Sequence, residues 1–173
     1  MEEPMPDAAP LEASLDRAAA LCARRGAQLT ELRRQVLRLV LESGQPVGAY
    51  ALLDRLKASR AGAAPPTVYR ALDFLVEQGL IHKVERLGAF IGCAEVEDHP
   101  EDCDCGAAHD HPHQFLICAR CGGTTEISDP GVALALHRAA AAAGFDLRRS
   151  TVEAEGICAV CRGAEGAHHA AHG

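Results

Sequence analysis

Four cysteines in the second half of the chain have the spacing of a metal site. They form two Cys-x-x-Cys pairs with 36 residues between the pairs, and they are Cys118, Cys121, Cys158 and Cys161. Each pair can place both sulfur atoms on one tight turn, and four thiolates meet the tetrahedral preference of Zn²⁺. Because such a site leaves no open coordination position, we expect it to stabilise the fold and to do no catalysis.

Other metal-binding side chains are spread over the middle of the chain. The candidates for a second site are His82, Cys93, His109, His111, His113 and Glu126. Each of them alone is more often a structural or solvated residue. However, His82 and Cys93 end the first half of the chain, whereas His111 and Glu126 open the second, so one shared ion could fix the angle between two domains. A set with one thiolate suits Zn²⁺ better than Fe²⁺ or Mn²⁺, which favour nitrogen and oxygen donors.

The segment of residues 94–110 is acidic, has no hydrophobic periodicity and contains further possible ligands, namely His99, Cys103, Cys105 and His109. A disordered acidic loop is the simpler interpretation. An accessory zinc site, or a ligand supplied to the second site, is the alternative. His113 and His109 therefore remain open as replacements for His111.

The charge of the chain is distributed unevenly. The net charge is −7 over 173 residues, yet residues 22–92 contain 11 Lys and Arg against 6 Asp and Glu. Residues 93–173 contain 5 basic residues against 13 acidic ones. We therefore expect the first half to face phosphates and the second half to have a different partner.

Several functional classes are disfavoured by what the sequence lacks. Residues 1–10 have neither the basic nor the apolar region of a signal peptide, and no apolar run approaches the roughly 20 residues of a membrane span. Without export, the eight cysteines are expected to bind metal in the cytoplasm rather than to form disulfides. No catalytic triad, HExxH motif or phosphate loop is present, so we expect no enzyme and no small-molecule substrate.

The first half has the periodicity of helices followed by a hairpin. Helices are expected over residues 11–25, after a Thr30 cap, around Leu52 and Leu56, and after a cap at Thr67. Two short strands flank a turn at residues 86–88. This order predicts a winged helix-turn-helix, whose second helix would enter the major groove. Tyr69 and Arg70 lie on the outer side of that helix and are the expected base contacts.

The second half has the pattern of a small mixed domain. Strands are expected over residues 114–118 and 123–127, a helix over 131–143 and a long strand over 145–157. The fold class is therefore α+β. The expected organisation is a disordered N-terminus (1–10), a winged-helix DNA-binding domain (11–93), an acidic loop (94–110), a small α/β domain with the four-cysteine zinc site (111–162) and a disordered tail (163–173).

The segment PPTVYRALDFLVEQGLIHKVE, together with FLICARCG and GICAVC, resembles the ferric-uptake-regulator superfamily and most of all its zinc-responsive branch. The resemblance covers roughly residues 11–162. It implies a homodimeric repressor whose C-terminal domain dimerises and which carries a structural and a regulatory zinc ion, about two per chain. It also implies that the zinc-loaded dimer binds AT-rich palindromic operator DNA and represses zinc-import genes.

Carried over residue by residue, the resemblance implies that the regulatory zinc ligands are His82, Cys93, His111 and Glu126. It assigns Tyr69 and Arg70 to the recognition helix. One alternative is a related sensor of iron, manganese or peroxide, which the Cys93 thiolate disfavours. A zinc-storage protein is a further alternative, but storage would not explain the TVYRAL segment or the basic first half.

Overall fold

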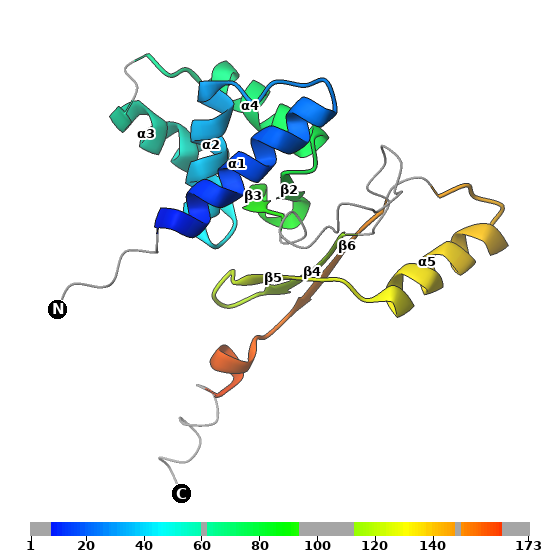
Figure 1. The fold of residues 1–173 in the computed structure, drawn as a ribbon. Helices are drawn as coiled ribbons and strands as arrows, with labels where there is room; N and C mark the ends of the chain where they lie inside the picture. The colour runs from blue at the N-terminus through cyan, green and yellow to red at the C-terminus, as the bar shows by residue number, and fades with distance from the viewer. Residues whose placement is uncertain (1–7, 60–61, 94–112, 148–149, 164–173) are drawn as a thin grey trace, which may run out of the picture. The chain divides into compact units, whose positions relative to one another are not determined.

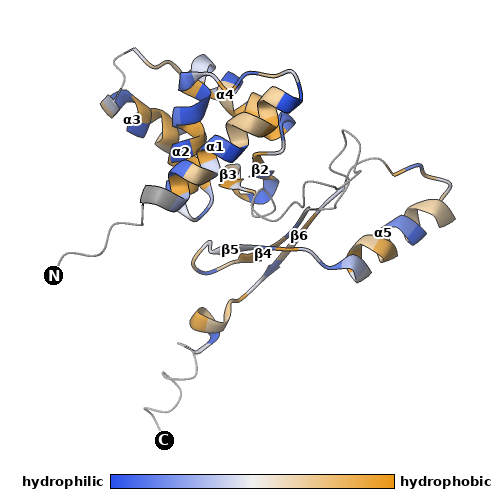
Figure 2. Ribbon diagram, in the orientation of Figure 1, coloured by the Kyte–Doolittle hydropathy of each residue, from blue (hydrophilic) through white to orange (hydrophobic). Residues whose placement is uncertain are grey.

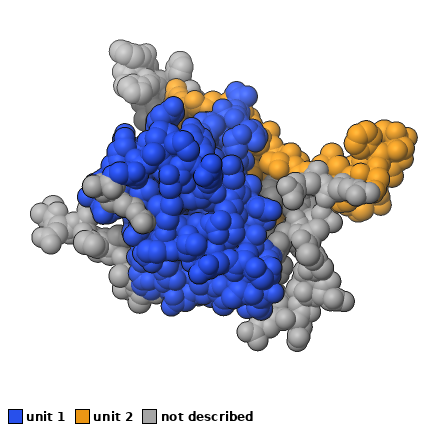
Figure 3. All heavy atoms as spheres, turned by 90° about the horizontal axis from the view of Figure 1, so that it is seen from above, with its two compact units in different colours: residues 1–103 blue, residues 104–173 orange. Residues whose placement is uncertain are grey.

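The computed structural model describes residues 8–59, 62–93, 113–147 and 150–163 (Figure 1). The chain divides into two compact units, unit 1 (residues 1–103) and unit 2 (residues 104–173), which Figure 3 colours separately. The expected loop over residues 94–110, together with His111, lies outside the described residues, as do residues 1–7 and 164–173. In the described part of the chain, no helix has the length and apolar character needed to cross a membrane.

Unit 1 is a winged helix-turn-helix, as the sequence predicted. Its helices are α1 (Ala8–Arg24), α2 (Glu31–Ser43), α3 (Ala49–Ser59) and α4 (Pro65–Glu77). Its strands are β1 (Val47–Gly48), β2 (Ile81–Val84) and β3 (Ala89–Gly92), and they form an antiparallel sheet in the order β1-β3-β2. A 3₁₀ turn, η1 (Glu85–Leu87), connects the two strands of the wing. The two-residue strand β1 was not predicted.

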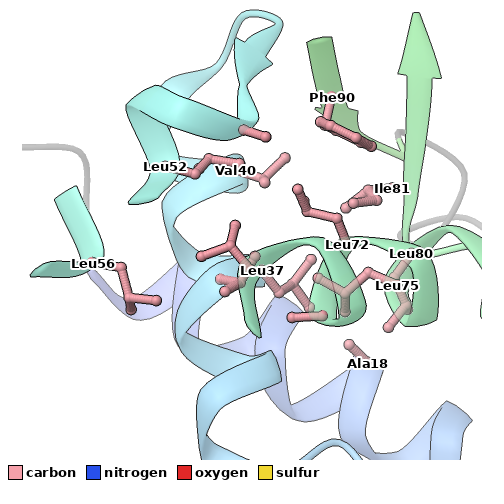
Figure 4. Close-up of a cluster of buried hydrophobic side chains, with 14 of the residues drawn as sticks. Ala18, Leu37, Val40, Leu52, Leu56, Leu72, Leu75, Leu80, Ile81 and Phe90 are labelled. Carbon is pink, nitrogen blue, oxygen red and sulfur yellow. The ribbon is translucent and has the colours of Figure 1, made fainter. Parts of the chain in front are cut away.

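An aliphatic core holds these elements together. Leu15, Leu52 and Leu72 come from three different helices, and none of them is exposed to solvent. Figure 4 shows that the wing closes this cluster, with Ile81 and Phe90 beside the side chains of α2 and α4. Cys22 is also fully buried here, which confirms that it is a core residue rather than a ligand.

Glycines mark the C-terminal ends of the helices, whereas the expected N-terminal caps do not form as predicted. Gly44 (φ 59°) ends α2 and Gly79 (φ 68°) follows α4, both in the left-handed region that glycine adopts easily. Thr30 is the N-cap residue of α2 but makes no side-chain cap hydrogen bond. The expected cap at Thr67 is wrong, because α4 already begins at Pro65, whose fixed φ suits a first helical turn. Similarly, α1 begins at Ala8, so residues 8–10 are helical and not a disordered end.

Unit 2 contains a three-stranded sheet and one helix. The strands are β4 (His113–Cys118), β5 (Thr124–Ile127) and β6 (Thr151–Gly156), in the order β5-β4-β6. Strand β4 runs antiparallel to β5 and parallel to β6. Helix α5 (Pro130–Ala142) is capped by Asp129, whose carboxylate accepts a hydrogen bond from the Gly131 amide at 2.7 Å. Strand β6 begins at Thr151, so the long strand expected from residue 145 is wrong at its start.

The described part of unit 2 buries little hydrophobic surface. Only Phe115, Ile117 and Cys118 are buried among its described hydrophobic residues. On α5, Leu134 is 51% exposed, and Phe145 just beyond the helix is 72% exposed. Figure 2 shows hydrophobic and hydrophilic residues side by side along this helix. A unit with so small a core needs a further source of stability, such as a metal ion or a partner surface.

Candidate metal centres and nucleic-acid interface

The sheet of unit 2 brings the four cysteines together. Cys118 is the last residue of β4, and it lies opposite Gly156, the last residue of the parallel strand β6. The two Cys-x-x-Cys pairs therefore lie at the same end of the sheet, where β4 and β6 both finish. The four sulfur atoms all lie within 4.8 Å of one another, and the Cys121 and Cys158 sulfurs are 3.9 Å apart. This confirms the proximity that the sequence spacing predicted.

Backbone turns shape both pairs into a metal-binding geometry. In the first pair, the Gly122 amide donates to the Cys118 carbonyl oxygen at 2.9 Å, and Gly122 adopts a positive φ of 70°. The Ala119 amide donates to the Gly156 carbonyl oxygen at 2.9 Å, which ties this turn to β6. The second pair leads into a short helical turn, residues 159–163. The two turns are thus fixed by hydrogen bonds that need no metal.

The thiols of this cluster have strongly unequal acidities. The Cys158, Cys121 and Arg120 amides donate to the Cys118 sulfur, and these hydrogen bonds lower the pKa of that thiol to about 6. Hydrogen bonding to the sulfurs of Cys158 and Cys121 raises the pKa of Cys161 to about 12. The protein alone therefore disfavours four adjacent negative charges. A divalent cation balances them, and four sulfur donors at this spacing fit Zn²⁺.

Arg120 connects the two cysteine turns independently of any ion. Its Nη1 donates to the Cys161 carbonyl oxygen at 3.0 Å, across 41 positions of sequence. A zinc ion with four thiolates would carry a net charge of −2, so the guanidinium also supplies a nearby positive charge. Arg162 directly follows the second pair and offers a matched basic residue for comparison. In the described structure its backbone amide donates to the Cys158 carbonyl oxygen.

We expect Arg120→Gln to speed zinc loss to a chelator roughly tenfold, in line with other residues that orient metal ligands. Arg162→Gln removes the same charge but not the bridge between the turns, and it should change the rate much less. The measurement is stopped-flow zinc transfer to a chromogenic chelator. Equal rates for both variants would show that the bridge has no role.

The expected ligands of the second site are divided between the units, and unit 1 contributes His82 and Cys93. His82 lies on β2 and is 7% exposed, and Cys93 directly follows β3. Their ligand atoms lie within 4.8 Å of each other. The Cys93 amide donates to the Leu80 carbonyl oxygen at 3.2 Å, which extends the pairing of β2 with β3 up to the thiol. Unit 1 therefore brings together one imidazole and one thiolate.

Gly92 fixes where Cys93 lies relative to the helices. A Cβ atom at Gly92 would be 2.6 Å from Cδ2 of Leu41, so the strand could not approach α2 as closely with any other residue unless Leu41 moved. In unit 2, Glu126 is half-buried on β5, opposite Phe115. His111 and His109 lie outside the described residues. His113 begins β4, where its backbone is opposite Thr151.

Helix α4 presents its polar side chains as the sequence predicted. Val68, Ala71, Leu72 and Leu75 form its buried face. On the other side, Tyr69 is 42% exposed and Arg70 is exposed. Val76, near the end of the helix, is a hydrophobic residue that is 36% exposed. A surface hollow of about 230 Å³ lies beside Arg70, and it is lined by Thr30, Leu32, Arg33, Thr67, Arg70 and Ala71.

Two arginines of the basic first half make contacts within unit 1. Arg34 donates to Asp16 at 2.7 Å and to Glu12 at 3.0 Å, so it joins α1 to α2. Hydrogen bonds from Arg38 and, more weakly, from Arg34 lower the pKa of the Glu12 carboxyl below its usual value. Arg33 lies over the ring of Phe74. Lys57 remains an exposed basic residue on α3, and Arg60 is outside the described residues.

Comparison with known proteins identifies the family of this chain. The model of the ferric uptake regulator family matches residues 24–155. The chain belongs to the ferric uptake regulator family. The zinc uptake regulation protein of Escherichia coli K12 is 41% identical over 155 residues, which cover 90% of this chain and 85% of that protein. The corresponding protein of Shigella flexneri matches with the same identity and coverage.

Solved structures of the same family agree. A zinc uptake regulator complexed with zinc and DNA is 40% identical, covers 90% of this chain and 97% of its own, and has a TM-score of 0.79. The crystal structure of holo XcZur is 40% identical, covers 87% of this chain and 98% of its own, and has a TM-score of 0.72. The family and its zinc-responsive branch, expected from the TVYRAL and cysteine motifs, are therefore confirmed.

Sequence reasoning missed several residues that shape these family sites. Arg120 was not singled out, because an arginine between two cysteines has no pattern that reveals its distant carbonyl acceptor. Gly92 was not singled out either, since its role depends on the approach of Leu41 from another element. For Arg33, only the structure shows the Phe74 ring beneath its guanidinium.

Proposed function

We propose that the protein is a zinc-responsive transcriptional repressor that binds palindromic operator DNA as a homodimer when zinc-loaded and represses zinc-uptake genes. The observation that carries the proposal is the similarity over nearly the whole chain to a zinc uptake regulator solved with zinc and DNA. The paired thiolates and the exposed face of α4 support the same function. As such a repressor, the protein would act in the cytoplasm, bind DNA and have no enzymatic activity.

A structural zinc ion is assigned to the four cysteines. The described part of unit 2 has few buried hydrophobic residues, and this observation supports the assignment. The ion would then supply much of the folding free energy. No coordination position would be left open. Cys118, Cys121, Cys158 and Cys161 would hold the ion as thiolates and would take no part in sensing.

A regulatory zinc ion is assigned to His82, Cys93, His111 and Glu126. The pairing of β2 with β3 already presents the imidazole of His82 and the thiolate of Cys93 to one another. The donor set includes one soft ligand, which suits Zn²⁺. Because two ligands belong to each unit, the bound ion would hold both units at one angle. Together the two assignments give about two zinc ions per chain.

Base recognition is assigned to Tyr69 and Arg70 on α4. An arginine can donate two hydrogen bonds to the O6 and N7 atoms of guanine, and a tyrosine ring can pack on a thymine methyl group. In a homodimer two such helices would reach half-sites about 34 Å apart on one face of the duplex. The exposed hydrophobic residues of unit 2, among them Leu116, Leu134 and Phe145, supply the surface for dimerisation.

Zinc would act through its different affinities for two conformations. If the ion binds better to the form in which both α4 helices fit the operator, it shifts the population toward that form. The direct test is fluorescence anisotropy of a labelled AT-rich palindrome, titrated with protein at fixed salt, with zinc or with a chelator. We expect binding to be roughly 5- to 150-fold tighter with zinc, which is the usual range of allosteric coupling. Equal affinities would contradict the proposal.

A sensor of iron, manganese or peroxide remains the second candidate, and the thiolate of Cys93 argues against it. Metal analysis and competition separate the candidates. A zinc sensor should retain about two zinc ions per chain and prefer Zn²⁺ to Mn²⁺ in activating DNA binding. A clearly larger zinc content, with no dependence of DNA binding on metal, would instead indicate a storage protein.

A further inference from the structure

Arg33 is held inside unit 1 by two contacts. Its Cζ atom lies 3.5 Å from the centre of the Phe74 ring, which is a close cation–π stack. Its Nη1 donates to the Gln28 carbonyl oxygen at 2.6 Å. Both Arg33 and Phe74 are half-buried. One guanidinium thus joins three segments of the chain: the connection before α2, α2 itself and α4.

The stack is placed where it can affect the proposed DNA contacts. Phe74 lies four residues after Arg70 on α4, so the two side chains share one side of the helix. Arg33 and Arg70 also line the same surface hollow. The positive charge of Arg33 therefore lies at the same hollow as Arg70, and repulsion between like charges favours an orientation of the Arg70 guanidinium away from it.

The contacts of Arg33 conflict with a role as a phosphate ligand. One face of the guanidinium is covered by the ring, and one of its outer N–H groups is used by the backbone. Lysine would not reproduce this arrangement, because an ammonium group has no flat face to stack and no fixed fork of donors. The arrangement is thus specific to arginine, and it uses one face and one donor of the guanidinium for contacts within the protein.

We infer that Arg33 is a positioning residue, which sets the orientation of α4 through Phe74 and directs Arg70 toward DNA without contacting a phosphate itself. The inference rests on the proposed function of α4 in reading the operator. It adds to that function a residue pair that no sequence motif reveals.

Salt dependence distinguishes positioning from phosphate contact. Each phosphate neutralised by a protein cation adds about 0.9 to the slope of log affinity against log salt concentration. Removing a phosphate contact therefore lowers the slope by about that amount, whereas disturbing the orientation of α4 lowers the affinity at every salt concentration and leaves the slope unchanged. Loss of base contacts should also reduce the ratio of operator to non-specific DNA affinity.

The test uses the zinc-loaded full-length protein and anisotropy with operator and non-specific DNA over a salt series. For Arg33→Gln and Phe74→Leu we expect losses of operator affinity of roughly three- to thirtyfold, from the usual strength of a cation–π pair. The slope should be unchanged for both. The double variant should bind no more than about threefold more weakly than the weaker single variant, since both changes remove one interaction.

Two conservative variants keep the test independent of folding defects. Phe74→Tyr retains an aromatic face and should bind operator DNA with nearly the affinity of the unsubstituted protein. Arg33→Lys retains the charge but not the stack, and it should resemble Arg33→Gln. If Arg33→Gln lowers the salt slope by about one, or if Arg33→Lys restores full affinity, Arg33 is a phosphate ligand and the inference fails. If the unsubstituted protein shows no zinc-dependent DNA binding, the proposed function fails instead.

Discussion

Replacing Cys118 with serine is expected to remove one zinc ion per chain and to unfold most of unit 2. A structural zinc site of this kind contributes an apparent 10–16 kcal/mol or so, which is about as large as the whole stability of an ordinary domain. In the described part of unit 2, only three hydrophobic residues are buried, so packing cannot replace the ion. Cys118 also ends the central strand β4, whose neighbours on both sides depend on it.

The measurement combines metal analysis with amide hydrogen exchange. In Cys118→Ser the zinc content should fall by about one ion per chain, and the amides of β4 and β6 should lose their protection. Cys22→Ala is the matched control, because it removes a cysteine that is buried in the helical core and is not part of the cluster. Its zinc content and the protection of β4 should remain those of the unsubstituted protein. Full zinc content in Cys118→Ser would rule out the four-cysteine assignment.

Replacing Cys93 with serine should instead leave unit 2 folded and shift the response of DNA binding to much higher zinc concentrations. Serine keeps the size of the side chain, but its hydroxyl stays protonated at neutral pH and is a poor ligand for Zn²⁺. We expect the regulatory site to lose at least roughly a hundredfold in zinc affinity, the upper end of what even indirect ligand changes cause. At zinc concentrations that saturate the unsubstituted protein, DNA affinity should then equal that of the metal-free form.

The two cysteine variants check each other. Cys93→Ser should keep one tightly bound zinc ion and the hydrogen-exchange protection of β4, which Cys118→Ser loses. Both should lose DNA binding, but only Cys93→Ser should recover it at zinc concentrations high enough to fill the weakened site. An unchanged zinc midpoint for DNA binding in Cys93→Ser would remove the thiolate from the sensing site and would favour a sensor of another metal.

Much of unit 1 could be predicted because hydrophobic periodicity reports directly on burial. Leu52 and Leu56 recur at helical spacing on α3, as do Val68 and Leu72 on α4, and each is buried. The errors occur where several local rules compete. Proline at the first turn prevailed over Thr67 as a cap, and β1 is a two-residue strand, which is too short to leave a pattern.

Unit 2 was harder to predict, because most of its described apolar residues are not buried. A long strand was expected from residue 145, yet Phe145 is exposed and β6 begins only at Thr151. The four-cysteine cluster was predictable, since Cys-x-x-Cys spacing fixes local geometry whatever surrounds it. The second site could not be derived from spacing alone, since its candidate ligands are far apart in sequence; within unit 1 the structure brings His82 and Cys93 together.

The central claim is that zinc binding and DNA binding are coupled through one conformational equilibrium. Thermodynamic linkage then requires reciprocity: the factor by which zinc tightens operator binding must equal the factor by which operator DNA tightens zinc binding. The deciding measurement is a titration of the regulatory site with a zinc buffer, with and without saturating operator DNA at fixed salt. The account predicts that both factors agree within error and exceed roughly fivefold, the lower end of typical allosteric coupling. A zinc affinity that operator DNA does not change would contradict it.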